Sequence, residues 1–331
     1  MSWDNYYSKH CARFYGWLPA SVEFKKRKGD KLSYLTLCDT NAIDIFMLEM
    51  EGVLERDENS ALTGVTICEM EESKITEIFQ NVNPPLREAI VKGKIQKLIL
   101  FEDTDELREM DPDGDVRNRD LRMKLNLRRD ALRLQNKFPF DIINFDPCDS
   151  LLYPERELFK SFDRIFELQK TLNEFLIFAT TPITASGEIL SLFERDFRQN
   201  VSEYRSIYEA SESFLNTTDF NEIGDEKRKI SVGFGKTLLA KLALKHNFKC
   251  SDLGIYIYEN DKGNLMLSSV CEIRTSIDDV DDWYPQLIVE LIKDSPSFFS
   301  FQQAQEDEKV KHHLERVISS RENIQRGFTI T

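Results

Sequence analysis

The chain has 331 residues, of which 41% are hydrophobic and 31% are charged, and its formal net charge is −14. It can bury a substantial core, and its acidic balance disfavours nucleic acid as a partner unless a local basic patch overrides it. The six cysteines are scattered without metal-ligand spacing, which predicts reduced core thiols and no metal site. The sequence shows no long apolar run and no signal-peptide pattern, which together with the cysteines predicts a cytoplasmic protein with no membrane contact.

Residues 1–30 carry aromatic side chains at roughly helical spacing and end in a basic run. This pattern predicts a helical segment packed on the edge of the domain. From residue 31 onward, short apolar runs alternate with amphipathic stretches that have the spacing of helices. The apolar runs predict five strands, at residues 33–37, 65–68, 95–101, 140–145 and 175–180. Strands that alternate with helices in this way predict an α/β fold with a parallel sheet and right-handed crossovers.

The second half of the chain departs from this alternation. Residues 184–229 are polar, contain no strand-like run and predict helical pieces. An apolar helix is predicted at 236–246, and two strand-like runs at 254–258 and 265–273 flank a turn-rich linker typical of a β-hairpin. The predicted organisation is an N-terminal helical and aromatic segment (1–30), an α/β core (31–182), a helical insertion (183–232), the last helix and hairpin of the core (233–275), and an acidic, helical C-terminal tail (276–331).

Acidic residues follow three of the predicted strands. Glu69 ends the second strand, Glu102 and Asp103 follow the third, and Asp146 follows the fourth. Pro147 then stops strand hydrogen bonding and turns the chain away from the sheet. Open α/β sheets bind their ligands outside the carboxyl ends of the strands, so these carboxylates are candidates for a binding or active site.

Five parallel strands closed by an antiparallel hairpin resemble the class I S-adenosylmethionine-dependent methyltransferases, over residues 31–275. That family has a seven-stranded, mostly parallel sheet with a C-terminal antiparallel hairpin and helices on both faces. Here a helical insertion precedes the last helix and the hairpin. Residues 140–147, Phe-Asp-Ile-Ile-Asn-Phe-Asp-Pro, are similar to the fourth strand of tRNA guanine-N2 dimethyltransferases. The resemblance implies S-adenosylmethionine as the cofactor.

The resemblance also implies roles for individual residues. Two ribose hydroxyls need a bidentate acceptor, and an amine that attacks a sulfonium methyl group needs in-line positioning. The implied roles are Glu69 at the ribose, Asp103 or Glu102 near the adenine, Asp39 and Asn41 in the loop under the methionine, Asp146 aligning a nucleophilic amine, and Pro147, Cys148 and Asp149 facing the substrate.

The loop after the first strand differs from the family pattern. Methyltransferases of this class use glycines there, because glycine lets the backbone approach the cofactor closely and adopt positive φ. Residues 37–44 contain no glycine. Two hypotheses therefore remain: a methyltransferase that acts on an amine of RNA, DNA or protein, or a cofactor-less subunit or scaffold of a multi-protein complex, for which a bacterial defence complex is one setting.

A basic stretch offers one route to nucleic acid despite the acidic net charge. It contains Arg117, Arg119, Arg122, Arg128 and Arg129. Leucines at helical spacing are interleaved with these arginines, which favours a solvated helix face for most of them. Phosphate contacts by the same side chains are the alternative.

Overall fold

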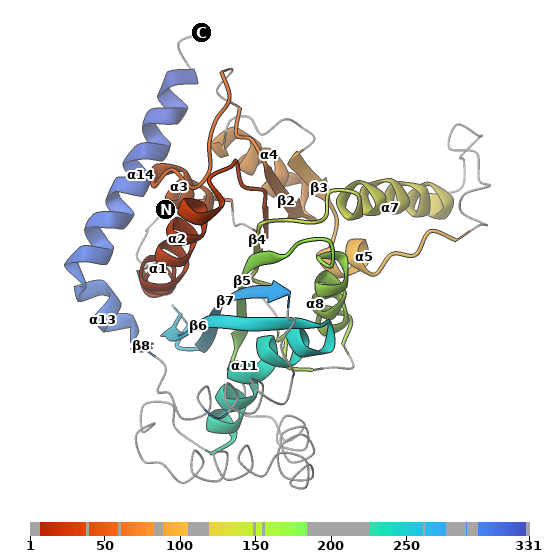
Figure 1. The fold of residues 1–331 in the computed structure, drawn as a ribbon. Coiled ribbons are helices and arrows are strands. Elements are labelled where there is room, and N and C mark those ends of the chain that lie inside the picture. Colours follow the sequence, from red (N-terminus) through yellow and green to blue (C-terminus); the bar gives the residue numbers. More distant parts are fainter. Residues whose placement is uncertain are drawn as a thin grey trace, which may run out of the picture.

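A computed structural model of the chain describes residues 7–37, 40–58, 61–82, 89–104, 119–147, 150–153, 156–183, 226–260, 262–275, 289 and 297–328. One mixed sheet forms the centre of the described part, and helices pack against it on both sides (Figure 1). The predicted α/β class with mostly parallel strands is confirmed.

The sheet has eight strands in the order β3-β2-β1-β4-β5-β7-β6-β8. In chain order they are β1 (Tyr34–Thr36), β2 (Val65–Glu69), β3 (Ile90–Lys92), β4 (Ile142–Phe145), β5 (Glu174–Pro182), β6 (Phe248–Glu259), β7 (Leu265–Thr275) and β8 (Ser297–Phe299). The first five strands are parallel to one another. Strand β7 is antiparallel to both β5 and β6, and β8 adds to β6 in parallel.

The helices form two layers. In chain order they are α1 (Tyr7–Ala12), a π-helical turn η2 (Arg13–Trp17), α2 (Leu18–Lys28), α3 (Ile43–Met50), α4 (Glu72–Val82), α5 (Ile95–Ile99), α7 (Arg119–Gln135), α8 (Glu157–Leu168), α11 (Glu226–Lys245), α13 (Phe301–Glu306) and α14 (Glu308–Phe328). Helices α5, α7, α8 and α11 cover one face, and α2, α3, α4 and α14 cover the other. None of these described helices is long and apolar enough to cross a bilayer.

Side chains along the central strands alternate between the two layers. Phe175 and Ile177 of β5 join the α8 side, while Leu176 and Phe178 join the α3 side. Because successive side chains of a strand point to opposite faces, a strand covered on both sides reads as a continuous apolar run. This is why the runs that became β4 and β5 could be recognised from the sequence.

The third predicted strand, at residues 95–101, is wrong. This stretch begins with helix α5, and the third strand is the shorter β3 just before it. Ile95, Leu98 and Ile99 are all buried in the same core cluster, which is the i, i+3, i+4 spacing of a helix. A short apolar run does not distinguish a buried strand from one helical turn and a half. Helix α11 likewise begins ahead of the predicted start at residue 236, at Glu226.

The N-terminal helices reach further into the fold than the edge of the domain. The Trp17 ring stacks on Phe178 of β5, with ring centroids 4.9 Å apart and an interplanar angle of 1°. Trp17 Nε1 donates a hydrogen bond to Ser268 Oγ of β7 at 3.0 Å. The segment therefore covers the middle of one sheet face.

The prediction of six reduced thiols is also wrong. Cys250 of β6 and Cys271 of β7 form a disulfide, whereas Cys11 and Cys68 are buried free thiols. The two bonded cysteines lie on adjacent antiparallel strands, and both point into the core on the α8 side. Strand pairing thus brings together two residues that spacing alone did not connect, and the argument for compartment from reduced cysteines loses its support.

Candidate functional site

The carboxyl ends of β1, β2 and β4 lie at one edge of the sheet. Thr36 of β1 pairs with Ile67 of β2 and with Asn144 of β4. The structure therefore brings Asn41, Glu69 and Asp146, which follow these strands, to the same edge. Three other residues with predicted roles, Asp39, Cys148 and Asp149, lie outside the described residues.

Asp146, the predicted catalytic residue, forms an ion pair with Lys9 of helix α1. Its side chain is 7% exposed, and that of Lys9 is 29% exposed. The strand end delivers a carboxylate, followed by Pro147, to the place that the sequence predicts. The cation that faces it comes from the N-terminal helix of the same chain, which sequence reasoning did not connect with this site.

Asn41 is 4% exposed and lies just before helix α3. Its Oδ1 accepts a hydrogen bond from Arg321 Nη1 of α14 at 3.1 Å. The following residue, Ala42, has φ 52° in the left-handed region, which is costly for a residue other than glycine. The loop after β1 thus makes its sharp turn at an alanine, and the C-terminal helix holds the asparagine beside it.

Glu69 ends β2, and its side chain binds the backbone of the two residues that lead into α4. Its Oε1 accepts hydrogen bonds from the backbone N–H groups of Met70 at 2.7 Å and Glu71 at 2.9 Å. A carboxylate at a helix start satisfies N–H groups that have no partner within the helix. The described contacts give Glu69 a structural role at the position expected to bind ribose.

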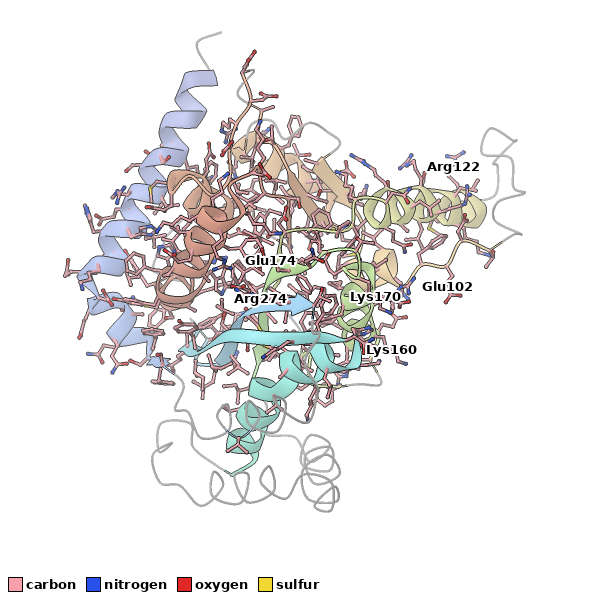
Figure 2. All side chains as sticks on the ribbon, in the orientation of Figure 1. Glu102, Arg122, Lys160, Lys170, Glu174 and Arg274 are labelled. Atoms are coloured by element: carbon pink, nitrogen blue, oxygen red, sulfur yellow. A yellow bond between two sulfur atoms is a disulfide. The ribbon has the colours of Figure 1, made fainter. Side chains whose placement is uncertain are left out.

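Asp103 is held against helix α7. Both of its carboxylate oxygens accept hydrogen bonds from Arg128, at 2.6 Å from Nε and 3.1 Å from Nη2. The hydrogen bond with Asp103 raises the pKa of Arg128 above its ordinary value. Glu102, the alternative for the adenine role, is exposed, and Figure 2 shows it near the end of the described segment after α5. Arg128, one of the residues considered for nucleic acid, is therefore engaged by a carboxylate.

A buried polar cluster lies beneath these strand ends and was not predicted. Asp44 of α3 is fully buried, and its Oδ2 accepts hydrogen bonds from three donors. These are Tyr34 Oη at 2.6 Å, Thr36 Oγ1 at 2.7 Å and Asn144 Nδ2 at 3.1 Å. Burial and the Asp44 carboxylate raise the pKa of Tyr34 well above its ordinary value. The cluster ties β1, β4 and α3 together directly behind the turn at Ala42. Polar residues inside otherwise apolar strand runs, Thr36 and Asn144, were the signal that could have revealed it.

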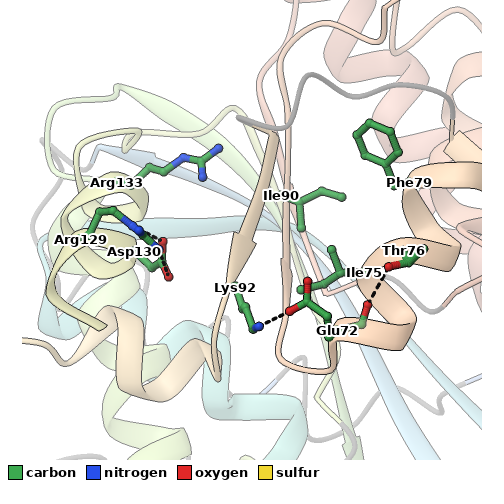
Figure 3. A pocket seen from close by; sticks show the side chains of 9 residues that line it. All are labelled: Glu72, Ile75, Thr76, Phe79, Ile90, Lys92, Arg129, Asp130 and Arg133. Carbon is green, nitrogen blue, oxygen red and sulfur yellow. Dashed lines mark hydrogen bonds and ion pairs between the residues drawn. The ribbon is translucent and has the colours of Figure 1, made fainter. Parts of the chain in front are cut away.

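A cavity of about 600 Å³ opens beside the outer strand β3 (Figure 3), close to the end of β2, because its lining residue Lys92 is the register partner of Glu69. It is lined by Glu72, Ile75, Thr76, Phe79, Ile90, Lys92, Arg129, Asp130 and Arg133. Ile75 and Phe79 of α4 give it an apolar side. Lys92 pairs with Glu72 across it, and Arg129 contacts Asp130 at 3.3 Å. None of the residues predicted for cofactor or catalysis lines this cavity, although Arg129 belongs to the basic stretch.

Comparisons with known proteins do not add to this picture. A scan against protein-family models finds no match, and neither the search of curated proteins nor that of solved structures returns one. Within the residues that the structure describes, no group of three or more His, Cys, Asp or Glu side chains is placed to hold a metal ion. The role of the chain therefore has to be argued from its own contacts.

Proposed function

We propose that this chain is a methyltransferase-fold protein that acts as a subunit or scaffold of a protein complex, and that it does not use S-adenosylmethionine. One observation carries the proposal. Three side chains expected to serve a cofactor or an amine are bound by basic side chains of the same chain. These contacts are Asp146 with Lys9, Asn41 with Arg321, and Asp103 with Arg128.

The strand order supports the methyltransferase part of the proposal. The order β3-β2-β1-β4-β5-β7-β6, with β7 antiparallel to its neighbours, agrees with the seven-stranded sheet and hairpin that the resemblance implies. Strand β8 extends that arrangement by one strand beside β6. The turn at Ala42, which contains no glycine, supports the other part of the proposal, because the family uses glycines in the loop that binds the cofactor.

The ion pair between Asp146 and Lys9 disfavours a catalytic role for Asp146. A ligand that needs this carboxylate has to displace Lys9 from a pair in which Asp146 is 7% exposed. Because Lys9 is 29% exposed, the cost of displacing it lies nearer the roughly 1 kcal/mol of an exposed ion pair than the cost of a fully buried one. A competing ligand is therefore weakened by a few-fold, since 1.4 kcal/mol is a factor of about ten in affinity.

Calorimetry with S-adenosylmethionine and S-adenosylhomocysteine tests the proposal. For the full chain we expect no saturable heat of binding at ligand concentrations up to about 1 mM, which is the dissociation constant of a weak ligand. We also expect no transfer of a radiolabelled methyl group to RNA, DNA or protein. One-to-one binding that is lost in Asp146→Asn or Glu69→Gln would overturn the proposal.

That outcome would favour the second candidate, a methyltransferase acting on an amine. This candidate is supported by the position of Asn41, Glu69 and Asp146 at the same edge of the sheet. In that case Lys9 would occupy the place of the amine in the resting protein. Lys9→Ala extends the calorimetry series: a methyltransferase should bind S-adenosylmethionine in the wild type and more tightly in the variant, whereas a chain without the family's cofactor loop should bind it in neither.

A further inference from the structure

Helices α1 and α14, near the two ends of the described chain, meet at a pair of buried histidines. Nε2 of His10 in α1 lies 3.0 Å from Nδ1 of His313 in α14. The rings are stacked, with centroids 5.2 Å apart. Both residues are buried, with exposed fractions of 0% and 5%. Two facing ring nitrogens at this distance share one hydrogen, so at least one of the two imidazoles is neutral in this contact, and full protonation of both rings breaks it.

The surroundings of the pair disfavour an added proton. Burial, together with His313 and Arg13, lowers the pKa of His10. Burial also lowers the pKa of His313, and the carboxylate of Glu51, 3.7 Å from His313 Nε2, only partly opposes this. The charged and titratable groups that act on the pair are Arg13 on His10, and Glu51, Arg316 and His312 on His313. Lys9 and Asp307 are already engaged, with Asp146 and Tyr15 respectively.

Helix α1 makes few buried apolar contacts with α14 besides this pair, and it also packs against α13 and β6. The cluster between α1, α13 and α14 has three buried members, Cys11, Ala304 and Val310, and is separate from the two main clusters. The following turn is anchored independently, because Trp17 belongs to the main cluster on the α3 side. Helix α14 is anchored there as well, through Leu314 and Val317. Release of α1 from α14 therefore has to free Tyr7 from the cluster on the α3 side, but it leaves Trp17, Leu314 and Val317 in place.

We propose that α1 is a releasable cap on Asp146, that the contact between His10 and His313 holds it closed, and that acid opens it. Lys9 directly precedes His10 in α1, so a movement of α1 away from α14 withdraws Lys9 from Asp146. Opening leaves the carboxyl edge of β4 accessible, whereas closure keeps it occupied. The cap uses the same Lys9 contact as the proposed function, but it makes a separate claim about movement and is tested without any cofactor.

The chain contains a matched pair of probes for this movement. Cys11 lies in α1 beside His10, and Cys68 lies in β2, between β3 and β1 in the sheet. Both thiols are buried, and burial raises the pKa of each to about 12. A reagent that reacts with thiols in acid, such as 4,4′-dithiodipyridine, followed by site-resolved mass spectrometry, measures their labelling rates in the full chain. The rate of Cys11 reports opening of α1, and that of Cys68 reports opening of the whole sheet.

We expect the ratio of the Cys11 rate to the Cys68 rate to rise at least tenfold between pH 7.5 and pH 5.5. Uptake of one proton on opening changes an equilibrium by up to tenfold per pH unit. A ratio that changes less than twofold, or a Cys11 rate that rises only in step with Cys68, overturns the proposal. The wild-type ratio decides this without any variant.

Three substitutions locate the response. His10→Phe and His313→Phe keep an aromatic ring at the contact but remove one titrating group each, so each should weaken the pH response and the double variant should abolish it. His246→Gln is the control, because His246 contacts Asp163 at 2.7 Å on the α8 side of the sheet. It should keep the full response. A full response that persists in the double phenylalanine variant, or a response that is lost in His246→Gln, assigns the effect to other groups and overturns the latch.

Discussion

At the residue scale, the chain places buried polar groups where their hydrogen bonds fix the geometry of the sheet edge. Asp44 and Asn144 are 0% and 1% exposed, and with Tyr34 and Thr36 they join one helix to two strands. The strand end at Asp146 was predictable, because a proline after an apolar run stops a strand. Its partner Lys9 was not, since pairing across the fold depends on where α1 packs. His10 and His313 had no visible partners in the sequence for the same reason.

We expect Asp44→Ala to lower the free energy of unfolding by about 3–5 kcal/mol, because it leaves three buried donors without their shared acceptor. Tyr34→Phe removes a single hydroxyl and should cost about 1 kcal/mol. Urea denaturation followed by circular dichroism measures both values. A cost below about 1 kcal/mol for Asp44→Ala would show that the cluster does not stabilise the edge.

At the element scale, the N-terminal helices are part of the core of the fold. Their helical and aromatic character was visible in the sequence, but their position over β5 and β7 depends on Trp17, whose ring and N–H contact two different strands. The error at residues 95–101 has the opposite cause. There the local pattern suited two kinds of element, and packing against α7 and α8 decided for the helix. Local pattern identifies an element best when the run is long and flanked by clear turns.

Trp17→Ala should cost about 3–5 kcal/mol of unfolding free energy, as expected for a fully buried aromatic residue. Trp17→Phe keeps the stack on Phe178 but loses the hydrogen bond to Ser268, so a smaller loss is expected. Met123, which is 55% exposed on α7, supplies the control, and Met123→Ala should change stability by less than about 0.5 kcal/mol. Equal effects of the Trp17→Ala and Met123→Ala substitutions would contradict the core position of the N-terminal segment.

At the scale of the whole molecule, the titration of the histidine pair should make stability depend on pH. The folded-state pKa values of His10 and His313 lie below their ordinary values. The unfolded chain therefore binds more protons near pH 6, and stability falls as the pH drops through about 6.5. The expected slope below that pH approaches about 1.4 kcal/mol per pH unit for each histidine.

The titration of Asp163 changes stability in a different pH range, so it does not obscure the pH dependence that comes from the histidine pair. Burial alone would raise its pKa, but hydrogen bonds from Lys245 and His246 outweigh burial and lower it. A depressed carboxylate pKa stabilises the fold above the unfolded value of about 3.9 and loses that contribution only as the solution becomes more acidic. Urea midpoints of the wild type and of the His10→Phe/His313→Phe double variant between pH 7.5 and pH 5 measure the histidine slope. A slope that persists in the double variant would contradict its assignment to the pair.

The overall fold class was predictable because strand-like runs alternate with helix-like stretches along the chain. Each strand–helix unit shows its own hydrophobic pattern, and its helix supplies the connection to the next parallel strand. The order of strands within the sheet and the meeting of the two terminal helices are properties of the assembled chain, so they carry no local signal. For this reason the sequence could identify which residues end strands at the ligand edge, but it could not reveal that basic side chains from α1 and α14 contact them.

The lengths of the strands across the sheet bear on how the protein behaves at high concentration. The two longest strands, β6 and β7, lie inside the sheet, whereas each outer strand, β3 and β8, is three residues long. Unpaired backbone groups on an outer strand are templates for joining another molecule, and a short outer strand presents few of them. Strand β8 pairs with only Tyr256, Ile257 and Tyr258 of β6, so among the described residues the other nine positions of this twelve-residue strand, rather than β8 itself, form the longer edge at which another molecule could pair.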